Sequence, residues 1–332
     1  MGIISIQNNS GIPKYRQIIT SVEQAIETNV LIKGDQLPSI NTIRKEFSLS
    51  RDTVLLAFNE LKLRGIVESV AGKGYYVKST KTKTKQKVFL LFDELNAFKE
   101  NLYHSFITNL DSNIDVDIYF HHFNIDVFES LIKNNAGNYN YYIIMPANLE
   151  NAHFAIDKLP KDKVIILDQT NPNLINYTSI YQNFERDIYN SLTEVLSKII
   201  TYNKLVLVFK EDKQPLGMLN GFQNFCSEFN LKSEVILRMR NRTIHKGDIY
   251  LVPDDRSLIL AIKKIKSSKL TLGKDIGIIS YNETLLKEIV ADGITTISTD
   301  FNYMGKRLAE IITQKETIKI ENPTSIIIRN SI

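Results

Sequence analysis

The most constraining stretch of this 332-residue chain runs from Leu37 to Val77, where two helix starts and a glycine turn follow in order. Ser39 can cap a short helix over residues 39–47, because its side-chain oxygen can accept a hydrogen bond from a first-turn amide. Ser50 can cap a longer helix over residues 50–64 in the same way. Only two residues then remain as the turn between the helices.

The second predicted helix has one apolar face. Val54, Phe58 and Leu61 recur at helical spacing and are expected to pack on the first helix. After residue 65, strands are predicted over residues 66–70 and 75–77, joined by a glycine hairpin over residues 71–74. This order predicts a winged helix-turn-helix, whose second helix inserts its N-terminal end into the major groove of DNA.

The exposed end of the second helix carries side chains that suit DNA. Arg51 can bond guanine O6 and N7 in bidentate fashion, and Ser50 and Thr53 can bond bases or a phosphate. Lys73 at the hairpin tip suits phosphates or a minor groove. The predicted DNA-binding residues are Ser39, Asn41, Ser50, Arg51, Asp52, Thr53, Gly72, Lys73 and Gly74.

Residues 11–77 resemble the DNA-binding domain of the GntR family. Its ordered motifs stand here as Pro13–Ile18, Gly34–Ser39, Ser50–Val54 and Gly72–Gly74. Four matches in order are more specific than a single short pattern. One departure is Asn41, which stands where the family usually has arginine, so the family's arginine contact does not carry over to this position, although Asn can donate to and accept from adenine.

Charge supports this assignment. Residues 1–87 hold 14 Lys and Arg against 7 Asp and Glu, a balance of +7; subtraction from the totals of 41 and 37 leaves 27 against 30, a balance of −3. Positive charge is thus concentrated in the predicted DNA module. A lysine and threonine run without apolar residues over 79–87 predicts a solvated linker with phosphate contact as a secondary role.

Several protein classes are disfavoured by composition. A single cysteine excludes a disulfide framework, and no apolar run resembles a signal peptide or a membrane span. We expect a cytoplasmic protein without membrane contact. The chain's length leaves room for one or two compact units after the DNA module.

From residue 88 onward, short apolar runs alternate with amphipathic segments, which predicts parallel βαβ units. The strand runs are 88–92, 116–120, 142–145, 164–167, 205–209, 249–252, 276–280 and 294–298. Helical segments are expected over 98–110, 184–200 and 218–229. Ligands of open parallel sheets bind beyond the carboxyl ends of the strands.

The residues at those strand ends form the predicted effector site. Carboxylates, amides and an aromatic ring suit a polyhydroxyl ligand, because each hydroxyl can be bonded twice while a ring covers the C–H face of a sugar. The predicted effector-binding residues are Asp93, Asn96, Phe98, Asp168, Asp254, Asn282 and Asp300.

Residues 87–328 are similar to the effector domains of the LacI/GalR family, which have the type I periplasmic-binding-protein fold. The resemblance rests on Gly293–Ile297, Met304–Ala309, Gly221–Phe222, Val252–Asp255 and Ile278–Asn282. It implies that Asp254 replaces an effector-binding Asn and that Asn282 replaces an effector-binding Asp. The arginine often found before Gly-Phe is missing, which favours a neutral effector over an acidic one or a sugar phosphate.

The expected architecture is therefore α/β: a winged helix-turn-helix over 1–78, a linker over 79–87, and a bilobed periplasmic-binding-protein-like domain over 88–332. The resemblance places the lobes at about 88–180 with 283–310 and 181–282 with 311–332. The expected protein is a homodimeric regulator, a repressor of carbohydrate-use genes. Its expected partners are operator DNA and a monosaccharide, of the L-arabinose or L-fucose type.

Alternatives remain open. The signal could be a nucleotide, another non-sugar ligand or a partner protein, and a DNA module fused to an enzyme is the remote alternative. No phosphate loop or nucleophile elbow is visible, so neither catalysis nor a cofactor is expected. His121 and His122 lack a third ligand at a metal spacing. Arg238, Arg240 and Arg242 predict a solvated strand or loop, with an anion site as the alternative.

Overall fold

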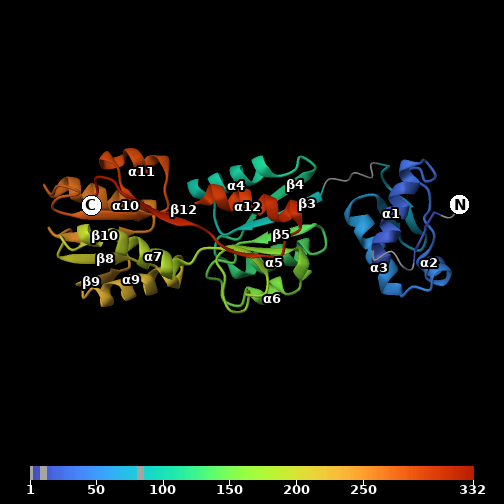
Figure 1. The fold of residues 1–332 in the computed structure, drawn as a ribbon, viewed down its shortest axis with the longest axis horizontal. Helices are drawn as coiled ribbons and strands as arrows, with labels where there is room; N and C mark the ends of the chain where they lie inside the picture. Colours follow the sequence, from blue (N-terminus) through green and yellow to red (C-terminus); the bar gives the residue numbers. More distant parts are fainter. Residues whose placement is uncertain (1–2, 8–12, 81–85) are drawn as a thin grey trace. The chain divides into compact units, whose positions relative to one another are not determined.

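The computed structural model describes residues 3–7, 13–80 and 86–332. It contains an N-terminal domain and a larger C-terminal domain, which are described separately (Figure 1). Residues 81–85 of the predicted linker, with Lys81, Lys83 and Lys85, lie outside the described residues. The predicted linker bound at residue 87 is wrong, because strand β3 (Gln86–Phe92) already begins at Gln86; the stretch before it stays a prediction.

The N-terminal domain contains three helices and a hairpin, and the helix-turn-helix prediction is confirmed. Its elements are α1 (Lys14–Glu27), α2 (Ile40–Phe47), α3 (Arg51–Leu63), β1 (Val67–Val70) and β2 (Gly74–Val77). The buried face of α3 is the predicted one, with Val54, Phe58 and Leu61 fully buried. Ser48 turns the chain between α2 and α3 in the left-handed conformation. Short backbone bonds from Gly34 and Leu37 to β2 hold the hairpin against the domain.

The first lobe of the C-terminal domain is a six-stranded sheet with helices packed on it, in the strand order β13-β7-β6-β5-β3-β4. Its strands are β3 (Gln86–Phe92), β4 (Ile114–Phe120), β5 (Tyr141–Ile144), β6 (Val164–Asp168), β7 (Thr178–Tyr181) and β13 (Lys319–Glu321). Its helices are α4 (Ala97–Asn109), α5 (Ile125–Asn135), α6 (His153–Ile156), a 3-10 turn η1 (Lys161–Lys163) and α12 (Phe301–Gln314). Continuous apolar runs such as 88–92 are buried on both faces, as expected for parallel strands under helices.

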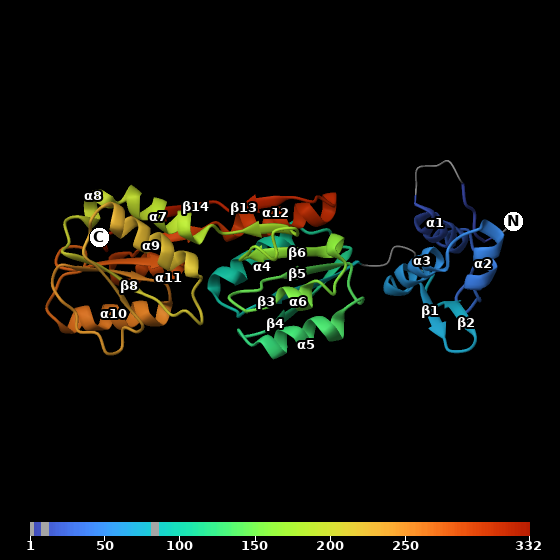
Figure 2. The ribbon, with the colours of Figure 1, turned by 90° about the horizontal axis from the view of Figure 1, so that it is seen from below.

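The second lobe has a six-stranded sheet in the order β14-β12-β11-β10-β8-β9, parallel except for the β12–β14 pair. Its strands are β8 (Lys204–Val208), β9 (Ser233–Ile236), β10 (Asp248–Val252), β11 (Gly277–Tyr281), β12 (Thr295–Thr299) and β14 (Thr324–Ile327). Its helices are α7 (Phe184–Glu194), α8 (Leu196–Ile199), α9 (Leu216–Glu228), α10 (Asp255–Ser267), α11 (Leu285–Ile289) and the 3-10 turn η2 (Val290–Asp292). Figure 2 shows α9 and α10 on opposite faces of this sheet.

Three segments cross between the lobes: β7 to α7, β12 to α12, and β13 to β14. The two lobes of the α/β domain agree with the expected fold, but the expected lobe boundaries are wrong near the C-terminal end. Residues 283–299 belong to the second lobe, because β12 pairs in parallel with β11. The chain crosses at Asp300, and only residues 301–321 return to the first lobe.

The close packing of α12 on α4 explains one glycine. A Cβ atom on Gly305 would lie 2.4 Å from the carbonyl oxygen of Leu102 and 2.8 Å from the amide nitrogen of Phe106. Both are backbone atoms, so only a residue without a side chain lets the two helices approach this closely. The crossover helix is thereby fixed to the first lobe.

Candidate functional site

The exposed start of α3 is the candidate DNA-reading surface. The side chain of Ser50 caps the helix by accepting a bond from the Thr53 amide at 3.1 Å, and the two hydroxyl oxygens lie 2.7 Å apart. Both hydroxyls are thus partly engaged with each other. Arg51 and Asp52 are exposed in the first turn, and within residues 3–7, 13–80 and 86–332 the Arg51 guanidinium has no ion pair or hydrogen bond. Arg51 is therefore free to reach a base edge.

The other predicted DNA-binding residues lie in α2 and the hairpin. Ser39 caps α2 by accepting from Thr42 at 3.1 Å, and Asn41 is exposed in its first turn. In the hairpin, Gly72 and Gly74 take positive φ values of 74° and 117°, which a glycine adopts without strain. The carbonyl of Lys73 accepts from the side chain of Gln36 at 2.6 Å, which leaves the ammonium of Lys73 exposed at the tip.

In the first lobe, two predicted effector residues share one buried cation. Lys99 of α4 is only 4% exposed, and its ammonium is ion-paired with Asp93, which follows β3. The second carboxyl, Asp168 at the end of β6, is 7% exposed and accepts from the side chain of Gln182. Burial lowers the pKa of Lys99 to about 8, and the charge of Asp168 opposes this shift. Burial likewise raises the pKa of Asp168.

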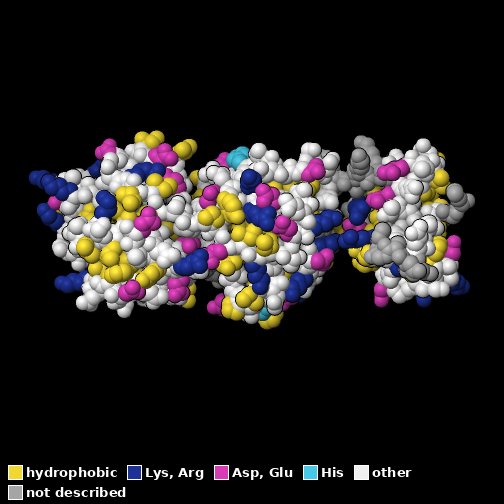
Figure 3. Space-filling view, in the orientation of Figure 1, with side chains coloured by type: hydrophobic (Ala, Val, Ile, Leu, Met, Phe, Trp, Pro, Cys, Tyr) yellow, Lys and Arg dark blue, Asp and Glu magenta, His cyan; other side chains and the backbone are white. Residues whose placement is uncertain are grey.

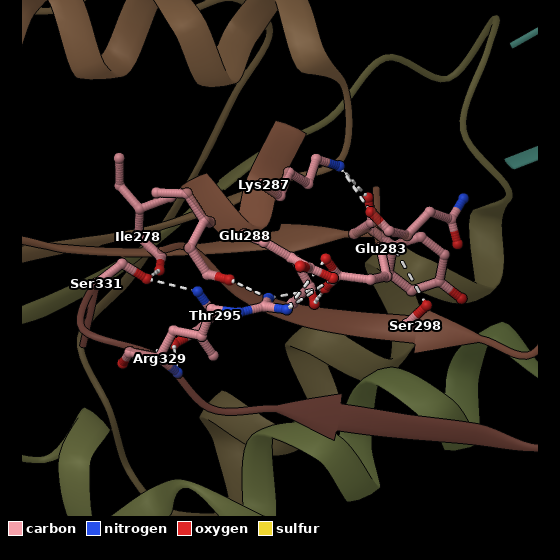
Figure 4. Close-up of polar contacts among 12 residues, drawn as sticks. Ile278, Glu283, Lys287, Glu288, Thr295, Ser298, Arg329 and Ser331 are labelled. Carbon is pink, nitrogen blue, oxygen red and sulfur yellow. Dashed lines mark hydrogen bonds and ion pairs between the residues drawn. The ribbon is translucent and has the colours of Figure 1, made fainter. Parts of the chain in front are cut away.

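In the second lobe, Asp254 and Asn282 lie around a second buried cation. The ammonium of Lys287, which is labelled in Figure 4, donates to the backbone carbonyls of Tyr281 at 2.8 Å and Asn282 at 2.7 Å. It also pairs with Asp255 at 3.0 Å. Burial lowers the pKa of Lys287, while the charges of Asp255, Glu283 and Asp254 raise it. The side chain of Asp254 caps α10 through the Ser257 amide at 2.9 Å.

Three polar atoms of this second cluster are buried without a hydrogen-bond partner among the described residues. They are Oδ2 of Asp254, Oδ1 of Asn282 and Oγ1 of Thr284. A buried oxygen without a partner costs roughly 1–3 kcal/mol. Such a group in a folded protein calls for an explanation, and a donating ligand is one.

The remaining predicted effector residues have structural contacts of their own. Asn96 caps α4 and accepts from the Lys99 amide at 3.1 Å, while Asp300 caps α12 and accepts from the Tyr303 amide at 2.8 Å. Phe98 stacks on Phe301 with ring centroids 4.9 Å apart. Asp300 is also exposed. These contacts explain the positions of the three side chains without any need for a ligand. Their role in effector binding therefore stays a prediction.

A cavity of about 810 Å³ lies between the lobes. Residues from the loops after β4, β5, β8 and β9 and from the start of α9 line it: Phe123, Ile125, Asn148, Leu149, Glu150, Glu211, Asp212, Leu216 and Leu237. Three of these lining residues, Glu150, Glu211 and Asp212, are acidic, and none is a lysine or an arginine. None of the seven predicted effector residues lines this space, so the strand ends that they occupy are not part of the open cavity.

Sequence reasoning missed Lys99, Gln182 and Lys287. Lys99 and Lys287 stand in helical segments, where a lysine is usually solvated, and only the fold shows that they point inward. Gln182 lies in a crossover and is 6% exposed; it accepts from the hydroxyl of Tyr281 at 3.0 Å. An uncompensated Asp at the carboxyl ends of two strands of the same sheet, β3 and β6, was the signal that could have suggested a buried cation.

His121 and Arg242 have structural roles, whereas Arg238 and Arg240 are exposed, as expected. His121 is buried, contacts the Met145 carbonyl at 3.0 Å, and burial lowers its pKa to about 4. Among the described residues no group of three side chains could hold a metal ion. The solvated reading of Arg242 is wrong: its side chain is 15% exposed and bonds Glu234 at 2.6 Å and Asp248 at 3.2 Å, which ties β9 to β10.

Among the described residues, none of the helices combines the length and the apolar character that a bilayer span requires.

Comparison with known proteins places both domains. The model of the gntR family of bacterial regulatory proteins matches residues 14–77. The mannosyl-D-glycerate transport/metabolism system repressor MngR of Escherichia coli is 37% identical over 90 residues, which are 27% of this chain and 35% of that protein. The chain spans less than half the length of several curated relatives that it matches.

Two solved structures share the fold of the C-terminal domain. A LacI family transcriptional regulator from Silicibacter pomeroyi superposes with a TM-score of 0.64 at 14% identity, over 74% of this chain and 98% of that one. A periplasmic binding protein/LacI transcriptional regulator from Alkaliphilus metalliredigens, complexed with D-xylulofuranose, gives 0.57 at 12% identity, over 74% and 98%. Residues 14–77 are thus a DNA-binding domain of the gntR family, joined to a C-terminal domain with the fold of LacI-like regulators.

Proposed function

We propose that this protein is a ligand-controlled transcriptional regulator, a homodimeric repressor of carbohydrate-use genes. One observation carries the proposal. The same chain joins an exposed gntR-type recognition helix to a two-lobed domain in which buried oxygens at the strand ends have no partner among the described residues. The first feature suits DNA, and the second suits a small ligand.

Operator recognition is assigned to the start of α3. The exposed guanidinium of Arg51 matches the two acceptors of guanine, a pairing that discriminates bases by about 1–3 kcal/mol. Lys73 at the hairpin tip would contact phosphates, which adds affinity without sequence preference. The capping bonds of Ser50 and Thr53 hold the first turn in place for this contact.

The proposed effector is a neutral monosaccharide, of the L-arabinose or L-fucose type. Sugar hydroxyls would donate to Oδ2 of Asp254, Oδ1 of Asn282 and Oγ1 of Thr284, which removes the cost of their unpaired burial. The acidic side chains Glu150, Glu211 and Asp212, which line the cavity between the lobes, disfavour phosphorylated or acidic sugars. One LacI-like structure of the same fold was solved with D-xylulofuranose.

Control would work through lobe closure. The side chain of Asn148 in the first lobe donates to the carbonyl of Gln214 in the second at 2.7 Å, and Lys213 lies 3.8 Å from Glu94. A ligand that prefers one lobe arrangement shifts the protein toward it and changes operator affinity by the difference in its affinity for the two states. Only such a difference transmits the signal.

The proposed dimer has an exposed apolar surface available on α11. Leu285 is 79% exposed, Leu286 54% and Ile289 78%, and Figure 3 shows hydrophobic side chains at the surface over this helix. Clustered apolar groups of this kind are typical of protein interfaces. Because Lys287 of the same helix is bonded to the Asn282 carbonyl, the surface is tied to the proposed effector site.

A non-sugar ligand is the second candidate, and the cavity lining favours it. Phe123, Leu216 and Leu237 present apolar surface to the space between the lobes, and Leu216 and Leu237 are more than half exposed. A flat apolar group, such as the base of an unphosphorylated nucleoside, would cover them.

A thermal-shift screen of the full chain tests the ligand class. The panel contains monosaccharides, sugar phosphates and nucleotides, and a ligand that binds only the folded state raises the melting temperature by mass action. We expect a neutral sugar to stabilise the wild-type protein and to have no effect on Asn282→Ala. If only a nucleotide stabilised the protein, the ligand would be of the second, non-sugar class. If a sugar stabilised Asn282→Ala as much as the wild type, the sugar site would not include Asn282.

A further inference from the structure

One residue, Asn322, contacts all three crossovers between the lobes. Its backbone amide donates to the carbonyl of Tyr181 in the first crossover at 2.8 Å. Its side-chain amide donates to the carbonyl of Asp300 in the second at 2.9 Å. Asn322 itself lies in the third crossover and is 2% exposed. Its Oδ1 atom is buried and has no partner among the described residues.

A chain of polar contacts runs through the same hinge. It starts at Asp168 in the first lobe, whose carboxylate accepts a hydrogen bond from the side chain of Gln182 in the first crossover. The hydroxyl of Thr299 in the second crossover donates to the same glutamine, and it lies 3.4 Å from the hydroxyl of Thr324 beyond the third. Thr324 in turn donates to Asp187 of α7 at 3.0 Å. The buried carboxylate of the first lobe is thereby connected to α7 of the second.

A pocket of about 290 Å³ lies at the α7 end of this chain. One face of α7 forms one wall, with Asp187, Asn190 and Glu194, and residues 321–325 of the third crossover form the other. The orphaned Asn322 is among the lining residues. The residues that line this hinge pocket are separate from those of the larger space between the lobes.

The charged residues that line the hinge pocket favour a cationic ligand. Its lining residues include Asp187, Glu194 and Glu321 against one cation, Arg186, and that guanidinium is paired with Glu321. Among the described residues, Asp187 and Glu194 have no ion pair of their own, although Asp187 lies within the field of Arg186 and accepts a hydrogen bond from Thr324. Glu194 also ends α7, where the helix dipole is negative and attracts positive charge.

The spacing of these two carboxyls suggests the shape of the ligand. Asp187 and Glu194 are seven residues apart on one helix face, a rise of about 10 Å at 1.5 Å per residue. A flexible linear molecule with an ammonium group at each end can reach both. We propose that the hinge pocket is a second ligand site, which binds a linear aliphatic diamine.

Diamine binding would affect the hinge, because residues of the third crossover line the pocket. The pocket also lies at the end of the series of polar contacts that starts at Asp168. The test uses the full chain and calorimetric titration with putrescine and cadaverine. Butylamine, with one ammonium, and butanediol, with none, are the matched ligands. Both variants keep side-chain size: Asp187→Asn retains an acceptor for Thr324, and Glu194→Gln changes an exposed side chain with little effect on folding.

We expect a diamine to bind the wild-type protein, and butylamine and butanediol to bind at least tenfold more weakly. Glu194→Gln should weaken diamine binding by about fivefold, the upper range for an exposed ion pair, and Asp187→Asn by more, because Asp187 is buried. Asp162→Asn, an exposed acidic residue of η1, should bind like the wild type.

Absence of diamine binding, equal binding of butylamine, or unchanged binding by both hinge variants would each overturn the proposal. The Asn282→Ala variant separates this site from the proposed sugar site. It should lose the sugar response and keep diamine binding, so failure of one proposal leaves the other unaffected.

Discussion

Removal of the buried ammonium of Lys99 should destabilise the C-terminal domain strongly. In Lys99→Met, the carboxyls of Asp93 and Asp168 stay buried, at 4% and 7% exposure, without their cation. Removing one partner of a buried ion pair costs about 3–5 kcal/mol. Asp168 keeps its bond from Gln182 and Asp93 keeps one from the Glu94 amide at 2.6 Å, so we expect the lower end, about 3 kcal/mol.

The pH dependence of this loss has a definite sign. Burial raises the pKa of the Asp168 carboxyl in the folded state, and without the ammonium the opposing charge of Lys99 is lost. A carboxyl of this kind destabilises the fold at pH values above its folded pKa, and the cost is relieved as the pH falls through that value. The stability difference between wild type and Lys99→Met should therefore be smaller near pH 5 than near pH 7.

Denaturant unfolding of the full chain, followed by far-ultraviolet circular dichroism at both pH values, measures the effect on the C-terminal transition. Lys158→Met is the matched control, because Lys158 is exposed, and it should change stability by less than about 0.5 kcal/mol. A loss below about 1 kcal/mol in Lys99→Met, or a loss that does not depend on pH, would refute the buried-pair reasoning.

Three further predictions concern other parts of the molecule. Arg51→Ala should weaken operator binding by about 1–3 kcal/mol, measured by fluorescence anisotropy, and an equal loss on random DNA would make Arg51 a phosphate contact instead. Gly305→Ala should lower stability by about 1–3 kcal/mol, since its Cβ would meet the backbone of α4; an unchanged melting temperature would disprove that contact. Burial raises the pKa of Cys226 to about 11, so its thiol should resist alkylation near pH 8 until the protein unfolds, and rapid labelling of the native protein would contradict this.

The N-terminal domain was predictable because its signals are local. A capping serine bonds an amide three residues on, so Ser39 and Ser50 mark the starts of α2 and α3 within one residue. The long apolar runs of the parallel sheets were also visible, since strands covered on both faces need them.

Other elements were not predictable because their signals are weak or nonlocal. The strands β7, β9, β13 and β14 are short, carry polar side chains and depend on neighbours far along the chain. For the same reason the crossover at Asp300 was misplaced. The predicted site residues occupy strand ends, but their partners Lys99, Gln182 and Lys287 come from helices and a crossover that only the fold brings near.

The most direct test of the account is operator affinity with and without the ligand that stabilises the protein. DNA selected from a random pool by the full chain would be labelled and titrated by fluorescence anisotropy. We expect a neutral sugar to lower the affinity of the wild-type protein, Asn282→Ala to bind the same DNA with no sugar effect, and Arg51→Ala to bind poorly in both cases. Sequence-specific binding that no ligand of the cleft changes would contradict the central claim.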